Sequence, residues 1–247
     1  MSGVNSIQDV DKSAQQLSFE LAGHRLFAHC SGALYLPDYD TLIVSDLHFE
    51  KGSAYARSGQ MLPPYDTRET LRRLAAVIAH FDPTCVIALG DSFHDLDAAG
   101  RMASADRETL KELVSQRERW IWIEGNHDPE PPEDLGGEVL HTLELGRLIL
   151  RHEPAQGEAV GEICGHLHPC AKVRGQGRSV RRFAFATNGK RLIMPAFGAY
   201  TGGLNVCDPA IVEVFGAVPS VLVLGRERVH AIAARQLVPD RQRARTR

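Results

Sequence analysis

The sequence predicts a layered α/β domain, with a mixed sheet or β-sandwich in the middle, helices outside and polar strand ends gathered along one rim. Two observations lead to this fold class. In the first half of the chain, apolar runs rich in β-branched residues alternate with segments of helical periodicity, and a polar cluster follows each apolar run. In the second half, short apolar runs separated by turn residues predict mostly β-structure.

Three buried strands are expected in the first half, because apolar residues run there without interruption. They are expected at residues 41–44, 84–89 and 120–123. Polar residues follow each of them directly. The carboxyl ends of such strands often hold ligands in α/β folds, so these positions are the first candidates for a functional site.

Two helices are expected in the same half, at residues 67–80 and 105–116. In the first of them, apolar residues recur at helical spacing: Leu71, Leu74, Ala75 and Ile78. Asp66 precedes this helix as the candidate N-cap, and Glu69 stands three residues further on. That arrangement predicts a capping box at the start of the helix.

Beyond Pro129 the pattern changes to strands joined by turns. Gly146 marks one turn, and Asn188-Gly189 marks the turn of a further hairpin. The strands are expected at residues 139–143, 148–151, 183–187, 192–194 and 221–224.

The chain is expected to form one unit, residues 1–247, because no Pro/Ser/Gly-rich linker divides it. Residues 1–16 are polar and lack the apolar core of a secretory signal, while residues 239–247 form a basic tail that is expected to be flexible. No apolar run approaches the roughly 18 residues of a membrane-spanning helix. The five cysteines are scattered without a paired CxxC spacing, which favours a reducing cytoplasm over a disulfide framework.

Side chains that commonly bind metal ions follow the apolar strands. Asp46 and His48 stand at i and i+2 on an extended segment, and that spacing turns both side chains to the same face. His166 and His168 repeat the arrangement later in the chain. Further candidates at strand ends are Asp91, Asn126, His127 and His152.

This donor set favours two metal ions over one. Mixed oxygen and nitrogen donors without thiolate suit Mn²⁺, Fe or Zn²⁺ better than Ca²⁺, and the candidates outnumber the ligands that one ion needs. Asp91 could bridge two ions, since its two carboxylate oxygens can each donate to a different metal. Two cations would then clamp a phosphate and lower the pKa of a bound water enough to supply hydroxide near neutral pH.

Each candidate alone is more often a capping or surface residue, and only the ordered set of strand-end clusters predicts a metal site. His94 and Asp95 stay open between a hydrogen-bonding role in their loop and direct contact with metal or substrate. The other histidines are expected to be ordinary surface or partly buried residues: His24, His29, His80, His141 and His230.

Five blocks follow one another along the chain: Ser45-Asp46-Leu47-His48, Gly90-Asp91, Gly125-Asn126-His127-Asp128, His152 and Gly165-His166-Leu167-His168. Their order resembles the signature of the calcineurin-like metallophosphoesterase superfamily. The resemblance implies a four-layer α/β/β/α sandwich with two divalent metals at strand ends. One metal would be held by Asp46, His48, Asp91 and His168. The other would be held by Asp91, Asn126, His152 and His166.

The resemblance also implies catalytic roles outside the metal ligands. His127 would act as the acid or electrostatic partner of the leaving-group oxygen, with Asp128 orienting its ring. A protonated imidazole there would offset the charge that develops on a leaving alkoxide. One departure from the superfamily pattern is Arg151, which precedes His152 where many members have Gly or Ser.

Four longer strings narrow the resemblance: Ser45-Asp46-Leu47-His48-Phe49-Glu50-Lys51-Gly52, Leu62-Pro63-Pro64-Tyr65-Asp66-Thr67, Gly90-Asp91-Ser92-Phe93-His94-Asp95, and Pro195-Ala196-Phe197-Gly198-Ala199-Tyr200-Thr201-Gly202-Gly203-Leu204-Asn205. Together they are similar to the bacterial ligase-associated DNA-damage-response endonuclease branch of the superfamily. This similarity implies a manganese-dependent phosphodiesterase or nuclease, linked to DNA repair and functionally associated with DNA ligase and helicase.

Local basic clusters matter more than total charge for a nucleic-acid substrate, because the net charge of -3 exerts no bulk attraction on nucleic acid or membrane. One cluster follows the last metal block and could hold a phosphate backbone: Lys172, Arg174, Arg178, Arg181 and Arg182. A solvated charged hairpin is the alternative. The tail could add a flexible phosphate contact or simply be a soluble terminus; its basic residues are Arg241, Arg243, Arg245 and Arg247. No motif with paired stacking aromatics occurs, which favours backbone recognition over sequence-specific binding.

Three function classes remain in view. The first is a phosphodiesterase or endonuclease that acts on nucleic acid. The second is the same catalytic site acting on a small nucleotide, a nucleotide-linked lipid precursor or a phosphoprotein. The third is a non-catalytic scaffold of the same fold, which missing ligands or a missing His127 would indicate. All of these residues are present in the sequence.

Overall fold

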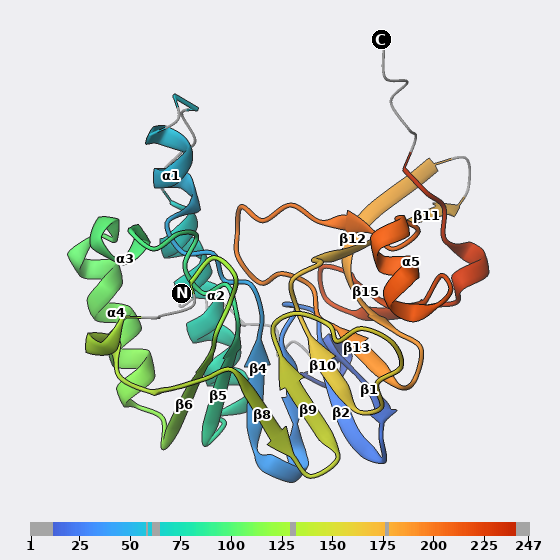
Figure 1. Ribbon diagram of the computed structural model, residues 1–247, viewed down its shortest axis with the longest axis horizontal. Coiled ribbons are helices and arrows are strands. Elements are labelled where there is room, and N and C mark those ends of the chain that lie inside the picture. The colour runs from blue at the N-terminus through green and yellow to red at the C-terminus, as the bar shows by residue number, and fades with distance from the viewer. Residues whose placement is uncertain (1–11, 58, 61–64, 129–131, 176–177, 241–247) are drawn as a thin grey trace, which may run out of the picture.

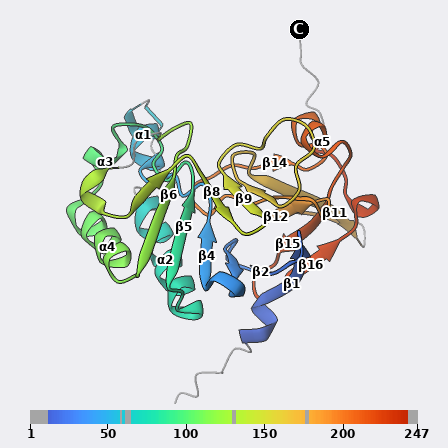
Figure 2. The ribbon, with the colours of Figure 1, turned by 60° about the horizontal axis from the view of Figure 1, so that its bottom comes forward.

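The computed structural model describes residues 12–57, 59–60, 65–128, 132–175 and 178–240. Their elements form four layers in the order helices, seven-stranded sheet, nine-stranded sheet and helix (Figure 1). A view turned by 60° shows the same succession of layers (Figure 2). The predicted α/β/β/α sandwich is therefore confirmed.

The first sheet brings three of the predicted strands together at its centre. Its strands are β1 (Gln16–Leu21), β2 (His24–His29), β3 (Leu34–Leu36), β4 (Thr41–Val44), β5 (Cys85–Leu89), β6 (Arg119–Ile123) and β7 (Glu138–Leu140), in that spatial order. The pairs from β1 to β4 are antiparallel, and those from β4 to β7 are parallel. The carboxyl ends of β4, β5 and β6 therefore meet at one edge.

The second sheet has the strand order β14-β11-β12-β13-β10-β9-β8, with β15 paired to β12 and β16 paired to β15. Its strands are β8 (Thr142–Leu145), β9 (Leu148–Arg151), β10 (Glu162–Cys164), β11 (Pro169–Gly175), β12 (Arg178–Thr187), β13 (Arg191–Ile193), β14 (Leu204–Asn205), β15 (Ser220–Leu224) and β16 (Val229–Ile232). β9 and β10 are parallel neighbours, so the segments that follow them leave the sheet at the same edge.

The helices cover the two outer faces. α1 (Lys51–Arg57), α2 (Asp66–Phe81), α3 (Ala98–Arg101) and α4 (Ser104–Ser115) lie beside the first sheet, and α5 (Pro209–Phe215) lies beside the second (Figure 1). Four short 3-10 helices are η1 (Lys12–Gln15), η2 (Pro37–Tyr39), η3 (Glu133–Leu135) and η4 (Ala234–Gln236). None of the helices in the described part of the chain has the length and apolar run needed to cross a membrane.

Side-chain alternation along the strands separates the three apolar layers between these elements. In β4, Leu42 and Val44 face the helices α2 and α4, whereas Ile43 faces the second sheet. In β5, Val86 faces the helices and Ile87 faces the second sheet. A third apolar cluster lies between the second sheet and α5. Because successive residues of a strand point to opposite faces, an uninterrupted apolar run is what a sheet covered on both faces requires.

Two local predictions are corrected by the structure. The strand predicted at residues 139–143 is interrupted at His141, where the chain passes from β7 in the first sheet to β8 in the second. An apolar run gives no signal of such a change of sheet. The capping box is also wrong, since Tyr65 occupies the N-cap and the Asp66 carboxylate accepts a hydrogen bond of 2.8 Å from the N–H of Gly52.

The predicted terminal segments lie partly outside the described residues. Of the polar segment 1–16, only Lys12–Gln15 and the first residue of β1 are described. Of the basic tail 239–247, its four arginines are outside the described range, as are residues 62–64 of the second resemblance string. Asp240, at the end of the described range, forms ion pairs with Lys172 and Arg181.

Candidate metal centre

The predicted ligands gather where strands of both sheets end, and several of them have an unusual backbone. Five lie in the left-handed region: Asp46 (φ 53), His48 (φ 45), Asp91 (φ 47), His166 (φ 66) and His168 (φ 45). Residues other than glycine rarely adopt this conformation, which costs on the order of 1–3 kcal/mol each and persists where the surrounding structure enforces it. The strand ends are thus bent sharply enough to turn successive side chains inward.

Glycines next to these ligands allow the loops to approach one another closely. Gly90 has a φ of +74, and a Cβ added to it would lie 2.2 Å from Nδ1 of His152. A Cβ on Gly165 would lie 2.0 Å from Oγ of Ser45. The glycines of the Gly-Asp and Gly-His-x-His blocks are therefore required by close packing between the two sheets at the site.

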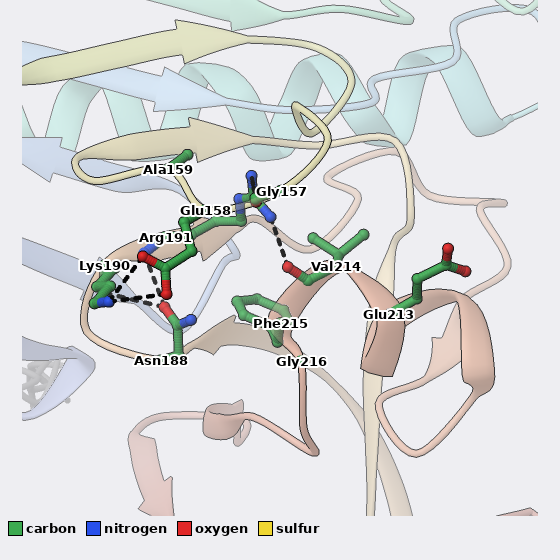
Figure 3. Close-up of a pocket in the computed structure, with 10 residues that line it drawn as sticks. All are labelled: Gly157, Glu158, Ala159, Asn188, Lys190, Arg191, Glu213, Val214, Phe215 and Gly216. Atoms are coloured by element: carbon green, nitrogen blue, oxygen red, sulfur yellow. Dashed lines mark hydrogen bonds and ion pairs between the residues drawn. The ribbon is translucent and has the colours of Figure 1, made fainter.

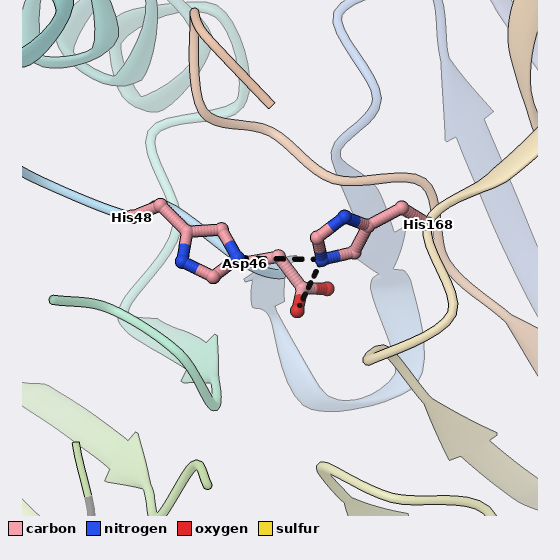
Figure 4. A group of neighbouring side chains, drawn as sticks. All are labelled: Asp46, His48 and His168. Carbon is pink, nitrogen blue, oxygen red and sulfur yellow. Dashed lines mark hydrogen bonds and ion pairs between the residues drawn. The ribbon is translucent and has the colours of Figure 1, made fainter. Parts of the chain in front are cut away.

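The first ligand group consists of Asp46, His48 and His168 (Figure 4). Nε2 of His168 lies 3.0 Å from Oδ1 of Asp46 and 3.4 Å from Nε2 of His48. Nδ1 of His168 faces the carbonyl of Gly202 at 3.2 Å, which leaves Nε2 to face the group. One carboxylate oxygen and two imidazole nitrogens therefore converge on one point.

The second ligand group consists of Asp91, His152 and His166, with Asn126 among them. Oδ1 of Asn126 lies 3.0 Å from Nε2 of His152 and 2.9 Å from Nδ1 of His166. Nε2 of His152 also lies 3.4 Å from Oδ2 of Asp91. Nδ1 of His152 faces the Leu89 carbonyl at 3.2 Å. The tautomer that donates from Nδ1 leaves the lone pair of Nε2 available to bind a metal ion.

Asp91 lies between the two groups. Its Oδ2 is 3.4 Å from Nε2 of His152 in the second group and 3.8 Å from Nε2 of His48 in the first. Its Oδ1 accepts a hydrogen bond of 2.9 Å from the backbone N–H of His127. A single oxygen, Oδ2, therefore faces both groups, whereas the sequence suggested one oxygen for each ion.

Burial and mutual charge perturb the ionisable groups of the centre. Burial would raise the pKa of Asp46, but the hydrogen bond with His168 and the charges of the neighbouring histidines hold it below its ordinary value. Burial lowers the pKa of His48 to about 3 against the opposing effect of Asp46 and Asp91. For His152, burial is outweighed by Asp91 and Asp46, which raise its pKa to about 9.

These residues fit divalent cations in donor type, number and charge. The ligand atoms within each group all lie within 4.8 Å of one another. Asp46 and Asp91 are buried, and among the described residues neither carboxylate has a Lys or Arg partner within 4.0 Å. Apart from the histidines of the two groups, no positive side chain in the described ranges balances these buried carboxylates, and cations bound to these oxygen and nitrogen donors would do so.

A family model described as calcineurin-like phosphoesterase matches residues 39–187, more than half of the chain. The chain belongs to the calcineurin-like phosphoesterase family. It is accordingly a metal-dependent phosphoesterase, and the two ligand groups indicate divalent metals.

Among solved structures, nuclease MPE from Pseudomonas putida is similar to this chain. The TM-score is 0.68 and the sequence identity 27%, over 88% of this chain and 100% of that chain. This likeness agrees with the nuclease branch that the longer sequence strings predict. Yfce, a phosphoesterase from E. coli, has a TM-score of 0.37 and 17% identity, over 80% of this chain and 96% of that chain. No match was found among curated proteins.

His127 lies beside the two groups and is exposed, whereas Asp46, His48, Asp91 and His152 are buried. Its side chain is 44% exposed, and its Nε2 lies 4.0 Å from Oδ2 of Asp91. Its ring stacks on that of His94, with centroids 5.5 Å apart and an angle of 16° between the planes. It also meets the edge of the His48 ring at a centroid distance of 5.4 Å. His94, left open by the sequence, is thus a neighbour of His127.

Asp128 does not have the contact expected of a residue that orients His127. Its Oδ2 accepts a hydrogen bond of 2.9 Å from the N–H of Phe93, and its Oδ1 has no hydrogen-bond partner among the described residues. Burial raises the pKa of this carboxyl group to about 8. Asp128 therefore supports the loop that follows β5, and the ring of His127 is held by stacking on His94.

The predicted basic cluster lies on the β11–β12 hairpin of the phosphoesterase, where Lys172 is paired with Arg181. Both are engaged with Asp240, at 3.5 Å and 3.2 Å respectively. Arg181 is exposed all the same, as are Arg174, Arg178 and Arg182. β11 begins one residue after His168, and at about 3.3 Å per residue Arg174 lies about 20 Å along the strand. The hairpin is therefore suited to contact a chain that extends away from the centre.

Two cavities differ in their relation to the centre. One of about 480 Å³ borders the second ligand group through Asn126 and His152. The other, of about 320 Å³, is lined by residues around Arg191 and is shown in Figure 3. The Arg191 guanidinium bonds the Glu162 carboxylate and the carbonyls of Ala155 and Val214. Because these partners occupy its donors, we assign Arg191 a structural role.

Proposed function

We propose that the protein is a dinuclear phosphodiesterase that cleaves nucleic acid, and specifically a DNA endonuclease. The observation that carries the proposal is the pair of ligand groups that share Oδ2 of Asp91, with His127 exposed beside them. The full-length similarity to a solved nuclease supports a phosphodiester substrate.

In this proposal each ligand group holds one divalent ion. Asp46, His48, Asp91 and His168 hold the first, and Asp91, Asn126, His152 and His166 hold the second. The convergence of these side chains supports the assignment. Bound there, two divalent cations would polarise a phosphate ester and lower the pKa of water enough to supply hydroxide near neutral pH. Donors without thiolate are consistent with Mn²⁺, and also with Fe or Zn²⁺.

The other residues of the centre donate a proton to the leaving group or fix the orientation of the metal ligands. His127 carries a proton at Nε2 toward the leaving-group oxygen, and its exposure leaves room for a substrate on that side. The N–H of His127 holds Oδ1 of Asp91, so the same residue fixes the shared carboxylate. Leu89 and Gly202 carbonyls fix the tautomers of His152 and His168.

The basic hairpin supports nucleic acid as the substrate class. The exposed side chains of Arg174, Arg178 and Arg182 would contact phosphates of a strand beyond the scissile bond. A role in DNA repair alongside DNA ligase and helicase, and a location in the cytoplasm, stay predictions of the sequence.

A substrate panel with purified protein tests the proposal. Single-stranded DNA, duplex DNA, RNA, cyclic nucleotides and aryl phosphate esters would be compared with Mn²⁺, after chelation, and with Fe²⁺ or Zn²⁺. We expect DNA cleavage that stops on chelation and returns with Mn²⁺. Full activity in metal-free protein would contradict the metal mechanism, and hydrolysis of cyclic nucleotides with intact DNA would contradict the proposed substrate.

A further inference from the structure

Lys51 lies at the edge of the candidate metal centre without being one of its ligands. It is the first residue of α1, three positions after His48. The loop that leads to it is joined to the loop after β5 by hydrogen bonds from the N–H of His48 to the Asp91 carbonyl, at 2.9 Å, and from the N–H of Phe49 to the Ser92 carbonyl, at 2.8 Å. These bonds fix the start of α1 next to the centre.

The ammonium group of Lys51 interacts electrostatically with the centre. It acts on the carboxylates of Asp46 and Asp91 and on the imidazoles of His48 and His94. The side chain is half-buried, and burial lowers its pKa. Within the described ranges, however, the ammonium has neither a hydrogen-bond partner nor a carboxylate oxygen within 4.0 Å. A positive charge is thus held at the rim without a direct partner among the residues that the structure describes.

Three acidic side chains from the segments around Lys51 have other hydrogen-bond partners. Glu50 accepts a hydrogen bond of 2.9 Å from the Thr67 hydroxyl. Asp66 accepts the N–H of Gly52 at 2.8 Å. Asp95 forms a bidentate pair with Arg101, with both contacts at 2.8 Å. The described part of the chain thus leaves the Lys51 ammonium available for an anion of the substrate.

We propose that the ammonium group of Lys51 binds a phosphate oxygen of the substrate, outside both metal ligand groups. This inference rests on the proposed function, because the ligand is the anionic backbone of a phosphodiester. A lysine ammonium is a compact positive charge with three donors, suited to a phosphate whose exact orientation is set by other groups. Lys51 would thereby determine on which side of the centre the substrate lies, namely the side of α1.

The phosphate contacted by Lys51 can be the one that is cleaved or its neighbour in the strand, and two substrates separate these sources. Bis(p-nitrophenyl) phosphate has a single phosphate, whereas a single-stranded DNA oligonucleotide has several. The variant Lys51→Met removes the charge and keeps the aliphatic stem, and Lys51→Arg keeps the charge. Lys111→Met is the matched control, because Lys111 on α4 is already paired with Asp134 of η3 at 3.0 Å.

The primary readout is equilibrium binding of a phosphorothioate DNA oligonucleotide to the Mn²⁺-loaded protein at several salt concentrations. We expect Lys51→Met to weaken binding by about 10- to 100-fold, the effect of losing one hydrogen bond to a charged group. The plot of log affinity against log salt should also become shallower by about 0.7, the slope of one phosphate contact on a single strand. Lys51→Arg and Lys111→Met should stay close to wild type, and all variants should retain two ions per chain.

Turnover then identifies the phosphate. An equal loss of kcat/KM on bis(p-nitrophenyl) phosphate assigns Lys51 to the scissile phosphate, and a loss confined to DNA assigns it to a neighbouring one. Wild-type affinity and salt slope in Lys51→Met would overturn the inference. If the wild-type protein hydrolyses no phosphodiester but its DNA binding depends on Lys51, the proposed function fails and the phosphate site stands.

Discussion

His48 and His152, one from each ligand group, are held by different physical means. His48 of the first group lies against the rings of His94, His127 and His168, and its buried Nδ1 has no hydrogen-bond partner among the described residues. His152 of the second group is held by a hydrogen bond from Nδ1 to the Leu89 carbonyl and borders a cavity of about 480 Å³. The orientation of His48 therefore depends on ring packing, and that of His152 on a hydrogen bond. Damage to each kind of support should affect one group and leave the other.

The largest effect is expected at the carboxylate common to both groups. Asp91→Asn removes the buried negative charge that faces His48 and His152, so both ions should bind weakly and activity should fall by more than about 10⁴-fold. Metal content per chain and kcat would be measured together. Asp46→Asn is the control, since loss of a ligand of one group should remove mainly one ion. Two bound ions and near-normal turnover in Asp91→Asn would exclude the bridging role.

A smaller loss is expected at His127, which belongs to neither group. His127→Ala should keep both ions and lose about 10²- to 10⁴-fold in kcat, the usual contribution of a positioned general acid. The loss should shrink for nitrophenyl esters, because a low-pKa phenolate needs little proton donation, whereas the alkoxide of a DNA sugar needs much more. An equal loss on both substrates would mean that His127 only positions the phosphate. Loss of one ion would make it a ligand.

Ring packing around His48 provides a test specific to the first group. His94→Ala removes the ring that contacts both His48 and His127, and we expect about tenfold weaker binding of one ion and a similar loss of kcat. His94→Phe retains a flat ring and should recover most of both. A two-step metal titration would show whether a single site is affected. Equal weakening of both sites would refute the distinction between the groups.

A histidine outside both groups gives the smallest expected effect, and it concerns stability alone. His29 is 6% exposed, and burial together with the charge of His80 lowers its pKa to about 4 from the ordinary 6.5. Between these values the unfolded chain binds a proton that the folded chain does not. The contribution of His29 to the free energy of unfolding is thus fully present above pH 6.5 and is lost as the pH falls toward 4.

Urea unfolding of metal-free protein would measure this loss. From pH 7 to pH 5, wild type should lose about 2 kcal/mol more of the free energy of unfolding than His29→Gln, which cannot titrate. The expectation that His29 is an ordinary histidine would return if both proteins had the same pH dependence.

The sequence was most informative where one pattern determines one structure. The uninterrupted apolar runs form β4, β5 and β6. The segment with apolar residues at helical spacing forms α2, and all four elements lie within one or two residues of the predicted limits. β2 was not predicted, because its sequence His24–His29 mixes polar and apolar residues without clear alternation. Its burial comes from pairing with β1 and β3, which is a property of the tertiary structure.

The centre followed the same rule. The polar clusters after the strands identified the residues that converge, but the extended i and i+2 geometry predicted for them is wrong. Asp46, His48, His166 and His168 lie beyond the ends of β4 and β10 in left-handed backbone, and His166 and His168 join different groups. Contacts between loops were beyond the sequence: Asp128 bonds the N–H of Phe93, 35 positions away in the chain, and His94 stacks on His127. Nothing local to Lys51 shows that its neighbouring acids have other partners. Such features depend on which loops meet, and only the assembled sheets determine that.

The left-handed backbone at five of the predicted ligands sets stability against function in this protein. Glycine or asparagine would adopt these conformations with less strain than aspartate or histidine. Variants selected only for resistance to heat are therefore expected to accumulate such substitutions at these positions. They would have a larger free energy of unfolding but would lack the predicted metal ligands. Selection for turnover in the same library would restore the strained residues. The residues found at these five positions would therefore show whether stability or turnover has been selected.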